Sequence, residues 1–550
     1  MPAICLGRPG VVAIDPYCAL HTPAESLRCP CPQLAHDHLD LLSSAAGGGL
    51  LDLPMGPDET GGGYLGPCCA GVSFGWPCAL AQCATNALNA LVLRHLQPAL
   101  HVCTNQIDNI FLNQLFPFLQ RGYRQYFEDH GSLDWRTGRP QSKLERIDQS
   151  TAVDLLKHHR IVAFPKFEVQ CERPKKSRLI QGNANERTAY EYPEEYAAIA
   201  NGLNEVSKAT IDLNGCKARF VYAGKHNHQE LSDIISDALL SAPNRFYLDE
   251  ADGSNWDVTM QAPTLTAEAA VYEALGSPVV KPFLARCQFA KGIIRTRCGP
   301  ERIVLKYTTR WKRLSGDWNT SVGNSIISML IRANVIKQLP AHLRPDEALC
   351  LFMGDDYLAV YIYRSKPKPS PVELRAAMDR LEQSYGITPK RGIFDDPLSV
   401  TFLSLGLWPT FSGRFVFLPH PAKQLRKIFW SSKRLPPQLV PHYQSNIAVA
   451  FWGVYHGFDF MTQFFKHHYT VVNPRRLLDT AMEMKVANLA GAQGVQWAAA
   501  FHHKYDITLT SLPTCVYQPY AVYYHPVVQE MLRLETLDPQ ERSRCLSRAP

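Results

Sequence analysis

The chain has 550 residues, which is long enough to bury one large hydrophobic core or several smaller ones. Its composition, 46% hydrophobic and 19% charged, is ordinary for a folded protein and excludes bulk disorder. The 57 Lys and Arg residues exceed the 50 Asp and Glu residues, so the net charge of +7 permits a polyanionic partner without requiring one.

The cellular setting follows from what the sequence lacks. Its 16 cysteines are too sparse for a disulfide scaffold, and its start lacks the basic residues and apolar run of a signal peptide. We therefore expect an intracellular protein with reduced thiols. No stretch of about 18 uninterrupted apolar residues is present, so no transmembrane segment is predicted.

Residues 1–70 are rich in Pro, Gly, Cys and His, which predicts an irregular N-terminal extension rather than a packed core. A zinc site is the less favoured alternative, because Cys29 and Cys31 are separated by one residue where zinc ligands are usually separated by two to four. The other candidate ligands are Cys18, His21, His36 and His38.

Residues 71–245 mix predicted helices and strands. Ile110 to Phe127 is an aromatic-rich helical stretch, and Arg160 to Phe164 and Arg219 to Tyr222 are predicted strands. Between these strands, the segment Pro-Lys-Lys-Ser-Arg-Leu-Ile-Gln contributes the basic residues Lys175, Lys176 and Arg178.

Phe246 to Asp252 is predicted to be a strand that delivers Asp252 to its end. Asp257 follows five residues later, in the turn that leads to a helix. Asp249 and Glu250 are competing carboxylates in the same strand, and the Asp-x4-Asp spacing favours Asp252 as the functional residue. Ordinary loop and helix-capping aspartates are the alternative interpretation.

The string Ser315-Gly-Asp-Trp-Asn-Thr-Ser-Val-Gly-Asn324 is the most specific element of the sequence. A Ser-Gly loop opens a helix in which Asn319 or Thr320 can cap the first turn, and Thr320 and Asn324 lie on the same early face. The apolar positions that repeat at helical spacing are Val322, Ile326, Met329, Ala333 and Ile336.

Gly354-Asp355-Asp356 forms the predicted turn of a β-hairpin between the apolar runs Ala348 to Met353 and Tyr357 to Tyr363. Glycine permits a tight turn, and the two aspartates project from its tip. A surface turn is the alternative, but adjacent carboxylates on a hairpin predicted to be buried require a cation. Magnesium favours such carboxylate oxygens together with substrate phosphates.

Two sets of basic residues follow. Lys390, in a predicted turn, is a candidate general acid, and a solvated lysine is an equal alternative. Beyond a hairpin from Phe411 to Pro419, the chain is mainly helical, with helices predicted over Ala422 to Trp430, Gln444 to Tyr455 and Arg475 to Ala490. Basic residues in and just after the first helix are candidate phosphate contacts to the product duplex, with a solvated face as an equal alternative: Lys423, Arg426, Lys427, Lys433 and Arg434.

In this ordered set of motifs the chain resembles the RNA-dependent RNA polymerases of positive-strand RNA viruses, and its Ser-Gly-Asp-x-Asn-Thr-x-x-Gly-Asn string is most similar to the tombusvirus-like (carmo-like) group. The resemblance covers roughly residues 160 to 430. It departs from that group at Tyr357, where a Cys is usual. It implies an α/β (α+β) fold of the right-handed palm–fingers–thumb type, with an antiparallel palm sheet and a mainly helical thumb.

The implied domains are an extension over residues 1–70, fingers over 71–245, a palm over 246–410 with a fingers insertion near 275–310, and a thumb over 411–550. By resemblance, Asp252 and Asp257 belong to motif A, Ser315 to Asn324 to motif B, and Gly354 to Asp356 to motif C. Lys175, Lys176 and Arg178 correspond to motif F, which contacts the incoming triphosphate, and Phe402 to Trp408 correspond to motif E, the primer grip.

The implied activity is RNA-templated RNA synthesis with two Mg²⁺ or Mn²⁺ ions, held by Asp252, Asp355 and Asp356. Asp257, Ser315, Thr320 and Asn324 are expected to bind the nucleotide, and Ser315 and Gly316 to position the template. The implied partners are RNA template and product, ribonucleoside triphosphates, and other viral or host replication proteins, in the host cytoplasm at a replication complex.

Two alternatives stay open. A reverse transcriptase shares the palm, but it usually carries a bulky aromatic residue in place of Asp257 and an aromatic residue in place of Gly354. A catalytically silent palm-like RNA-binding scaffold is disfavoured because all the metal carboxylates are present.

Overall fold

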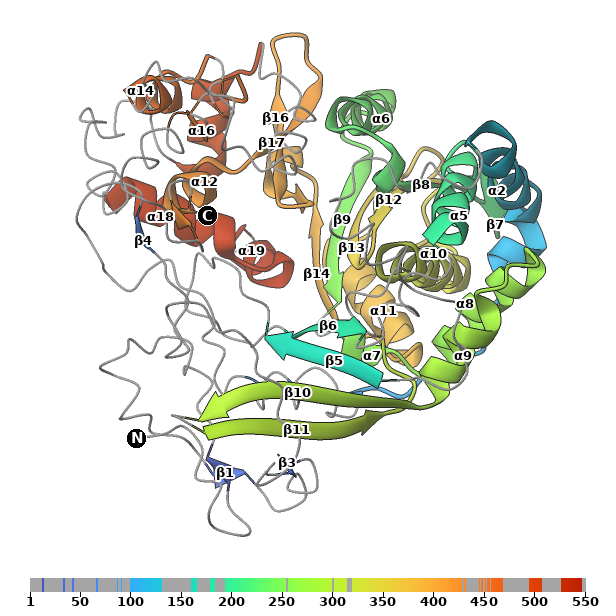
Figure 1. Cartoon of the computed structure of the whole chain (residues 1–550). Helices are drawn as coiled ribbons and strands as arrows, with labels where there is room; N and C mark the ends of the chain where they lie inside the picture. The colour runs from blue at the N-terminus through green and yellow to red at the C-terminus, as the bar shows by residue number, and fades with distance from the viewer. Residues whose placement is uncertain are drawn as a thin grey trace.

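The structure, a computed structural model of the whole chain, describes most of the region between residues 193 and 427 and parts of the remainder (Figure 1). The described ranges are 99–130, 160–165, 179–183, 193–253, 256–298, 301–313, 319–427, 457–467, 494–506 and 526–546, with short segments at 12–13, 33–34, 42–43, 66–67, 87, 91, 430–431, 445, 447–448, 451 and 453–455. No helix within these ranges is long and apolar enough to cross a lipid bilayer.

A six-stranded sheet organises the centre of the protein, in the order β14-β9-β13-β12-β8-β7. Its strands are β7 (Ile211–Leu213), β8 (Cys216–Tyr222), β9 (Phe246–Gly253), β12 (Glu347–Met353), β13 (Asp356–Ile362) and β14 (Pro389–Phe394). All neighbours are antiparallel except β8 and β12, so the sheet is mixed, and the expectation of an antiparallel sheet is wrong at that one pair. A parallel pair needs a long connection, and the chain between β8 and β12 supplies one. Two of the six strands, β7 and β8, precede residue 246, where the predicted palm begins.

Both faces of this sheet are buried, which explains its nearly continuous apolar strands. Along β13, Tyr357, Ala359 and Tyr361 enter one hydrophobic cluster with the helices, whereas Leu358 and Val360 enter a second one. The first cluster gathers η4 (Phe111–Leu115), α2 (Phe116–His130), α5 (Pro193–Val206), α8 (Ala262–Ala274), α9 (Val280–Gln288), α10 (Thr320–Gln338) and α11 (Pro371–Ser384). The second lies under α6 (His228–Ser241) and a three-stranded sheet of β15 (Thr401–Phe402), β16 (Leu405–Pro409) and β17 (Phe415–Pro419).

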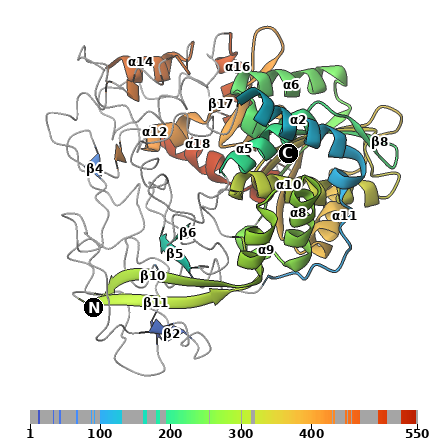
Figure 2. The same ribbon diagram turned by 45° about the vertical axis from the view of Figure 1, so that its right-hand side comes forward.

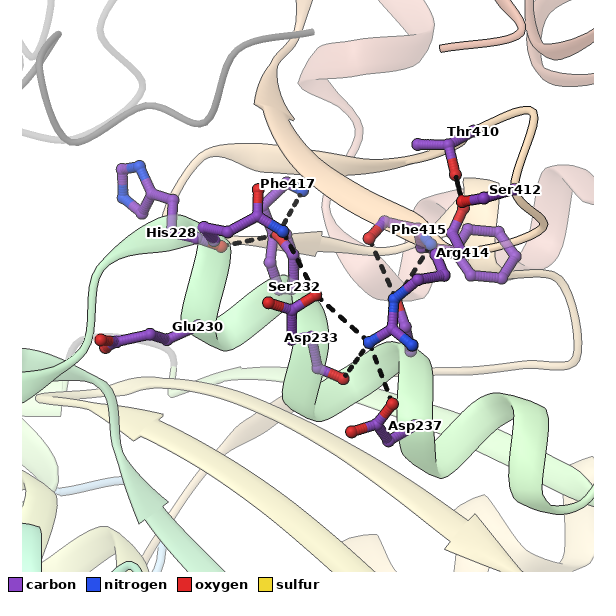
Figure 3. A network of polar contacts seen from close by, with 12 residues as sticks. His228, Glu230, Ser232, Asp233, Asp237, Thr410, Ser412, Arg414, Phe415 and Phe417 are labelled. Atoms are coloured by element: carbon purple, nitrogen blue, oxygen red, sulfur yellow. Dashed lines mark hydrogen bonds and ion pairs between the residues drawn. The ribbon is translucent and has the colours of Figure 1, made fainter. Parts of the chain in front are cut away.

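Helix α6 covers the edge strand β17, as Figure 3 shows. Ser232 Oγ accepts a hydrogen bond from the Phe417 N–H at 2.9 Å, and Ser236 Oγ accepts one from the Phe415 N–H at 2.9 Å. The side chain of Arg414 pairs with Asp233 and Asp237 on the same helix (Figure 3). The helix thus satisfies backbone donors that an uncovered edge would leave to another chain.

A second, five-stranded sheet has the order β3-β11-β10-β5-β6. Its longest part is the hairpin of β10 (Ala290–Cys298) and β11 (Glu301–Thr309), which follows α9 and extends away from the first sheet (Figures 1 and 2). The smaller strands are β3 (Leu42–Ser43), β5 (Arg160–Pro165) and β6 (Leu179–Asn183). The hairpin lies within the predicted insertion near residues 275–310.

The C-terminal part forms a third hydrophobic cluster around Trp408, Tyr455, Trp497 and Phe501. The described helices of this C-terminal part are α12 (Pro421–Lys427), α14 (Asp459–His467), α16 (Trp497–Tyr505), α18 (Pro526–Thr536) and α19 (Pro539–Leu546). The other described elements are short: β1 (Val12–Ala13), β2 (Gln33–Leu34), β4 (Gly66–Pro67), β18 (Trp430–Ser431), η6 (Ala223–Lys225), α7 (Trp256–Thr259) and η7 (Pro397–Ser399). The fold is mixed α/β.

Most predicted elements that fall on described residues are confirmed: the helix near residues 110–127, the strands near 160–164, 219–222 and 246–252, the hairpin around residue 354 and the helix from Thr320. The helix predicted to reach Trp430 is wrong at its end, since Trp430 lies in β18. The turn around Gly413 is confirmed, with a glycine φ of +78°, but its first strand is β16, before Phe411. The helix predicted over 475–490 and the Cys and His residues of the extension lie outside the described residues.

Candidate active site

The Gly354–Asp355 turn joins β12 to β13, with Met353 paired to Asp356. Gly354 has a φ of +68° at the first central position, which glycine adopts without a steric penalty. Its N–H donates to Ser325 Oγ of α10 at 2.8 Å. Both aspartates are exposed at the turn. The sequence predicted this turn, but not the buried serine that holds it against the helix.

Asp252 lies at the end of β9, beside the same turn. The last paired residues of β9 and β13 are Ala251 and Tyr357, so continuing that register by one residue places Asp252 opposite Asp356. On its other side, Asp252 pairs in register with Lys390 of β14. Because cross-strand partners share a face, Asp252, Asp356 and Lys390 lie on one face at the same strand ends, and Asp355 lies in the adjoining turn. The Nζ atom of Lys390 is 3.3 Å from Asp538 Oδ2, just before α19.

The competing carboxylates of β9 have structural partners. Asp249 is fully buried and pairs with Arg391. Glu250 accepts hydrogen bonds from Arg542 of α19 at 2.7 Å and from the Thr401 N–H at 2.8 Å. Asp252 is exposed, so its carboxylate is the one of the three that solvent and ligands can reach.

A buried ionic network supports this strand end from the opposite face. Arg391 contacts Asp249, Glu382 and Asp379, the last at 2.9 Å, and Arg332 of α10 also pairs with Glu382. The network joins β9 and β14 to helices α10 and α11. Burial and the nearby charge of Arg391 lower the pKa of Arg332. Burial also acts to lower the pKa of Arg391, but the carboxylates around Arg391 outweigh it and raise that pKa.

The network continues into the strand that follows the turn. Tyr361 Oη donates to Asp249 at 3.0 Å and lies 2.5 Å from Tyr357 Oη, and the Arg332 guanidinium lies 4.2 Å from the centre of the Tyr357 ring. Burial raises the pKa of both tyrosines well above the ordinary value, so they stay neutral donors. Tyr357, the departure from the family pattern, is therefore a buried structural residue.

The start of α10 is held by a second buried ion pair. Glu268 of α8 accepts hydrogen bonds from Arg313 at 3.3 Å, from Asn319 Nδ2 at 3.0 Å and from Tyr272 Oη at 2.6 Å. Asn319 occupies the N-cap position, but its side chain makes no capping bond, so of the two predicted capping residues Asn319 does not fill that role. A Cβ atom at Gly323 would lie 2.0 Å from Glu268 Oε1, which explains why this helix carries a glycine.

Arg313 and Asn319 flank residues 314–318, so the shared partner Glu268 fixes both ends of the segment that carries the predicted template contacts. Ser315 and Gly316 themselves lie outside the described residues. The connection through Glu268 could not be predicted from local sequence, because this residue is 45 positions from Arg313.

The predicted sugar-binding residues are both buried. Asp257 is in the first turn of α7 with 7% exposure, and Asn324 is on α10 with 4% exposure. Asn324 Oδ1 has no hydrogen-bond partner among the described residues. A buried acceptor of this kind is costly unless a ligand or water satisfies it. Thr320, the first residue of α10, is partly exposed.

The predicted phosphate contacts are only partly described. Lys175, Lys176 and Arg178 lie outside the described residues, in the sequence between the paired strands β5 and β6. Lys423 is on α12, where its backbone N–H donates to Glu535 at 2.7 Å. Arg426 and Lys427 also belong to α12, but their side chains lie outside the described part.

Within the described ranges, no group of three or more His, Cys, Asp or Glu side chains is arranged to hold a metal ion. Magnesium sites commonly use one or two carboxylates together with substrate phosphates, and the exposed oxygens of Asp252, Asp355 and Asp356 have that chemistry. No protein-family model matches the chain, and no curated protein matches it.

Proposed function

We propose that the protein is an RNA-directed RNA polymerase that copies a viral RNA genome from ribonucleoside triphosphates. One observation carries the proposal: the register of the central sheet brings Asp252 opposite Asp356, beside the Gly354–Asp355 turn. The order of the sequence motifs and their resemblance to viral polymerases support the same function. In this proposal the six-stranded sheet with α10 and α11 is the palm, the β10–β11 hairpin belongs to the fingers, and the C-terminal helices form the thumb.

Asp252, Asp355 and Asp356 are the residues that would hold Mg²⁺ or Mn²⁺. Two such ions, when bound, activate the ribose 3′-hydroxyl and stabilise charge on the leaving pyrophosphate. The protein's own contribution is rigidity. The turn is held by Ser325, and β9 is held by the Arg391 network, so the carboxylates keep their positions without a large reorganisation.

The remaining residues act on substrate. Asp257 and Asn324 would bind the ribose, and the unsatisfied Asn324 Oδ1 is an acceptor for a hydroxyl donor. Lys175, Lys176 and Arg178 would pair with triphosphate oxygens, as charge-assisted contacts to phosphate do. Ser315 and Gly316 would position the template, on a segment whose ends are fixed through Glu268. Lys390 would protonate pyrophosphate after release from Asp538.

Nucleotide incorporation tests the proposal. The assay combines purified protein, a homopolymeric RNA template, Mg²⁺ or Mn²⁺ and labelled ribonucleotides, with and without primer. We expect Asp252→Asn and Asp355→Asn each to lower synthesis about a thousandfold or more, because a metal ligand supplies several kcal/mol in the transition state. The matched control is Asp395→Asn, an exposed aspartate just past the other end of β14, which should keep wild-type activity. Equal activity in all three variants would refute the assignment.

A further inference from the structure

The β10–β11 hairpin is the most basic described element of the protein. Residues 289–310 contain six basic residues, Lys291, Arg295, Arg297, Arg302, Lys306 and Arg310, against one acidic residue, Glu301. The hairpin therefore carries a net charge of +5, where the whole chain carries +7. The sequence motifs did not single out this segment.

The strand register places the cations on one face. Lys291 pairs with Thr308, Ile293 with Lys306, Arg295 with Val304 and Arg297 with Arg302, and side chains two residues apart share a face. Continuing the register by one pair puts Phe289 opposite Arg310. All six basic positions therefore belong to one face, whereas Glu301 belongs to the other.

The opposite face packs inward. Ala290 and Ile294 are fully buried there, and the Tyr307 ring lies across Gly292, where a Cβ atom would come within 2.0 Å of it. At the described base of the hairpin, burial of this face leaves the basic face as the one that meets solvent. Lys291 and Arg310 are exposed, Arg295 is partly exposed, and none of them forms an ion pair with a carboxylate of the described residues.

An aromatic ring accompanies these cations at the base of the hairpin. Phe289 is 37% exposed, Lys291 Nζ lies 5.8 Å from its ring centre, and the Arg310 guanidinium carbon lies 5.9 Å from it. An exposed ring flanked by cations is the combination by which proteins bind single-stranded nucleic acid: bases stack on the ring while phosphates pair with the charges. Duplex nucleic acid hides its base faces, so the ring favours a single strand.

We propose that this face of the β10–β11 hairpin is a binding surface for single-stranded RNA, with Phe289 as a base-stacking platform and Lys291, Arg295 and Arg310 as phosphate contacts. The proposal rests on the proposed polymerase function, in which the bound strand is the template. Lys291 and Arg295 are four residues apart on one strand, or roughly 13 Å, a spacing that suits alternate phosphates of an extended chain.

Salt-dependent binding tests the cations. The variant Lys291→Gln/Arg295→Gln/Arg310→Gln and the charge-matched control Lys208→Gln/Lys217→Gln/Arg380→Gln, all exposed on other elements, are titrated with a fluorescein-labelled oligouridylate without nucleotides. Each phosphate contact to a single strand contributes about 0.7 to the slope of log affinity against log salt, so the hairpin variant should lose about 2 from that slope. Its affinity should fall on the order of tenfold or more, and the control should match wild type.

The aromatic contact is tested separately. Phe289→Leu should weaken oligouridylate binding about fivefold or more, because stacking contributes about 1–3 kcal/mol per base, and Phe289→Trp should retain it. Equal loss in the hairpin variant and its control, or equal binding by Phe289→Leu and wild type, would overturn the proposal. The same variants are also titrated with anionic phospholipid vesicles. If they lose affinity for the vesicles but keep wild-type affinity for RNA, the proposal is likewise overturned.

The outcome is distinguishable from failure of the polymerase proposal. Asp355→Asn should bind oligouridylate like wild type while losing synthesis. If wild type makes no RNA but the hairpin variants lose RNA affinity, the RNA-binding surface is supported and the polymerase function is refuted. If synthesis requires Asp355 but the hairpin variants bind RNA as tightly as wild type, the polymerase function is supported and the RNA-binding surface is refuted.

Discussion

Replacing Gly323 by alanine tests how tightly helix α10 packs on the buried Glu268–Arg313 pair. In an open helix the substitution would stabilise by about 1 kcal/mol, because glycine is the poorer helix former. Here the new Cβ atom would lie 2.0 Å from Glu268 Oε1 and 2.8 Å from its Cδ. Arg313, Asn319 and Tyr272 hold that carboxylate, so it cannot move aside without losing hydrogen bonds.

Overpacking in a core costs about 1–3 kcal/mol, and breaking a buried ion pair costs about 3–5 kcal/mol. Because the carboxylate must give up its partners, the ion-pair cost applies. Subtracting the gain in helix propensity from it, we expect Gly323→Ala to lower the free energy of unfolding by about 2–4 kcal/mol. Urea denaturation followed by tryptophan fluorescence measures it. The matched control is Gly453→Ala, at an exposed glycine whose Cβ would meet no atom within 4 Å, and it should change stability by less than about 0.5 kcal/mol.

A double-mutant cycle identifies the cause. In a Glu268→Ala background the carboxylate is gone, so adding Gly323→Ala should be neutral or stabilise by up to about 1 kcal/mol. Wild-type stability of Gly323→Ala alone, or an equal loss in both backgrounds, would refute the claim that the carboxylate makes this glycine necessary.

Three further outcomes are expected. Arg391→Met should lower the free energy of unfolding in urea by about 3–5 kcal/mol, because it leaves Asp249 buried without its cation; a loss under about 1 kcal/mol would contradict this. Asp257→Ala and Asn324→Ala should narrow the preference for ribonucleotides over deoxyribonucleotides on the order of tenfold in competition assays, and an unchanged ratio would remove both from the sugar site. Burial and neighbouring charges lower the pKa of Lys504 to about 8. Between about pH 8 and 10 the unfolded chain keeps this proton and the folded chain has lost it, so Lys504 contributes a rise in stability with pH of ~2 kcal/mol, and the pH profiles of wild type and Lys504→Met should differ by that amount.

The sequence pattern was sufficient to predict those elements whose structure depends on neighbouring residues. Apolar alternation and turn chemistry predicted the β12–β13 hairpin, and helical periodicity from Val322 predicted α10, because each depends on neighbouring residues. The position of Asp252 at a strand end followed from the apolar run before it. Its place opposite Asp356 did not, because the register between strands that are distant in sequence is set by tertiary packing.

The supporting residues were missed for a physical reason. Glu268, Arg313 and Arg391 are charged, and charged residues are almost always at the surface unless they are paired. Their burial depends on partners far along the chain: Arg391 meets Asp249 across 142 positions. The parallel pairing of β8 with β12 was missed similarly, because nothing local to either strand encodes its neighbour.

Template-dependent nucleotide choice tests the polymerase proposal most directly. Purified protein is offered each of four homopolymeric RNA templates with each labelled ribonucleotide in turn, in Mg²⁺ or Mn²⁺. We predict that each template directs incorporation of its complementary ribonucleotide alone, and that Asp355→Asn abolishes it. Incorporation that ignores the template, or that persists in Asp355→Asn, would contradict the account.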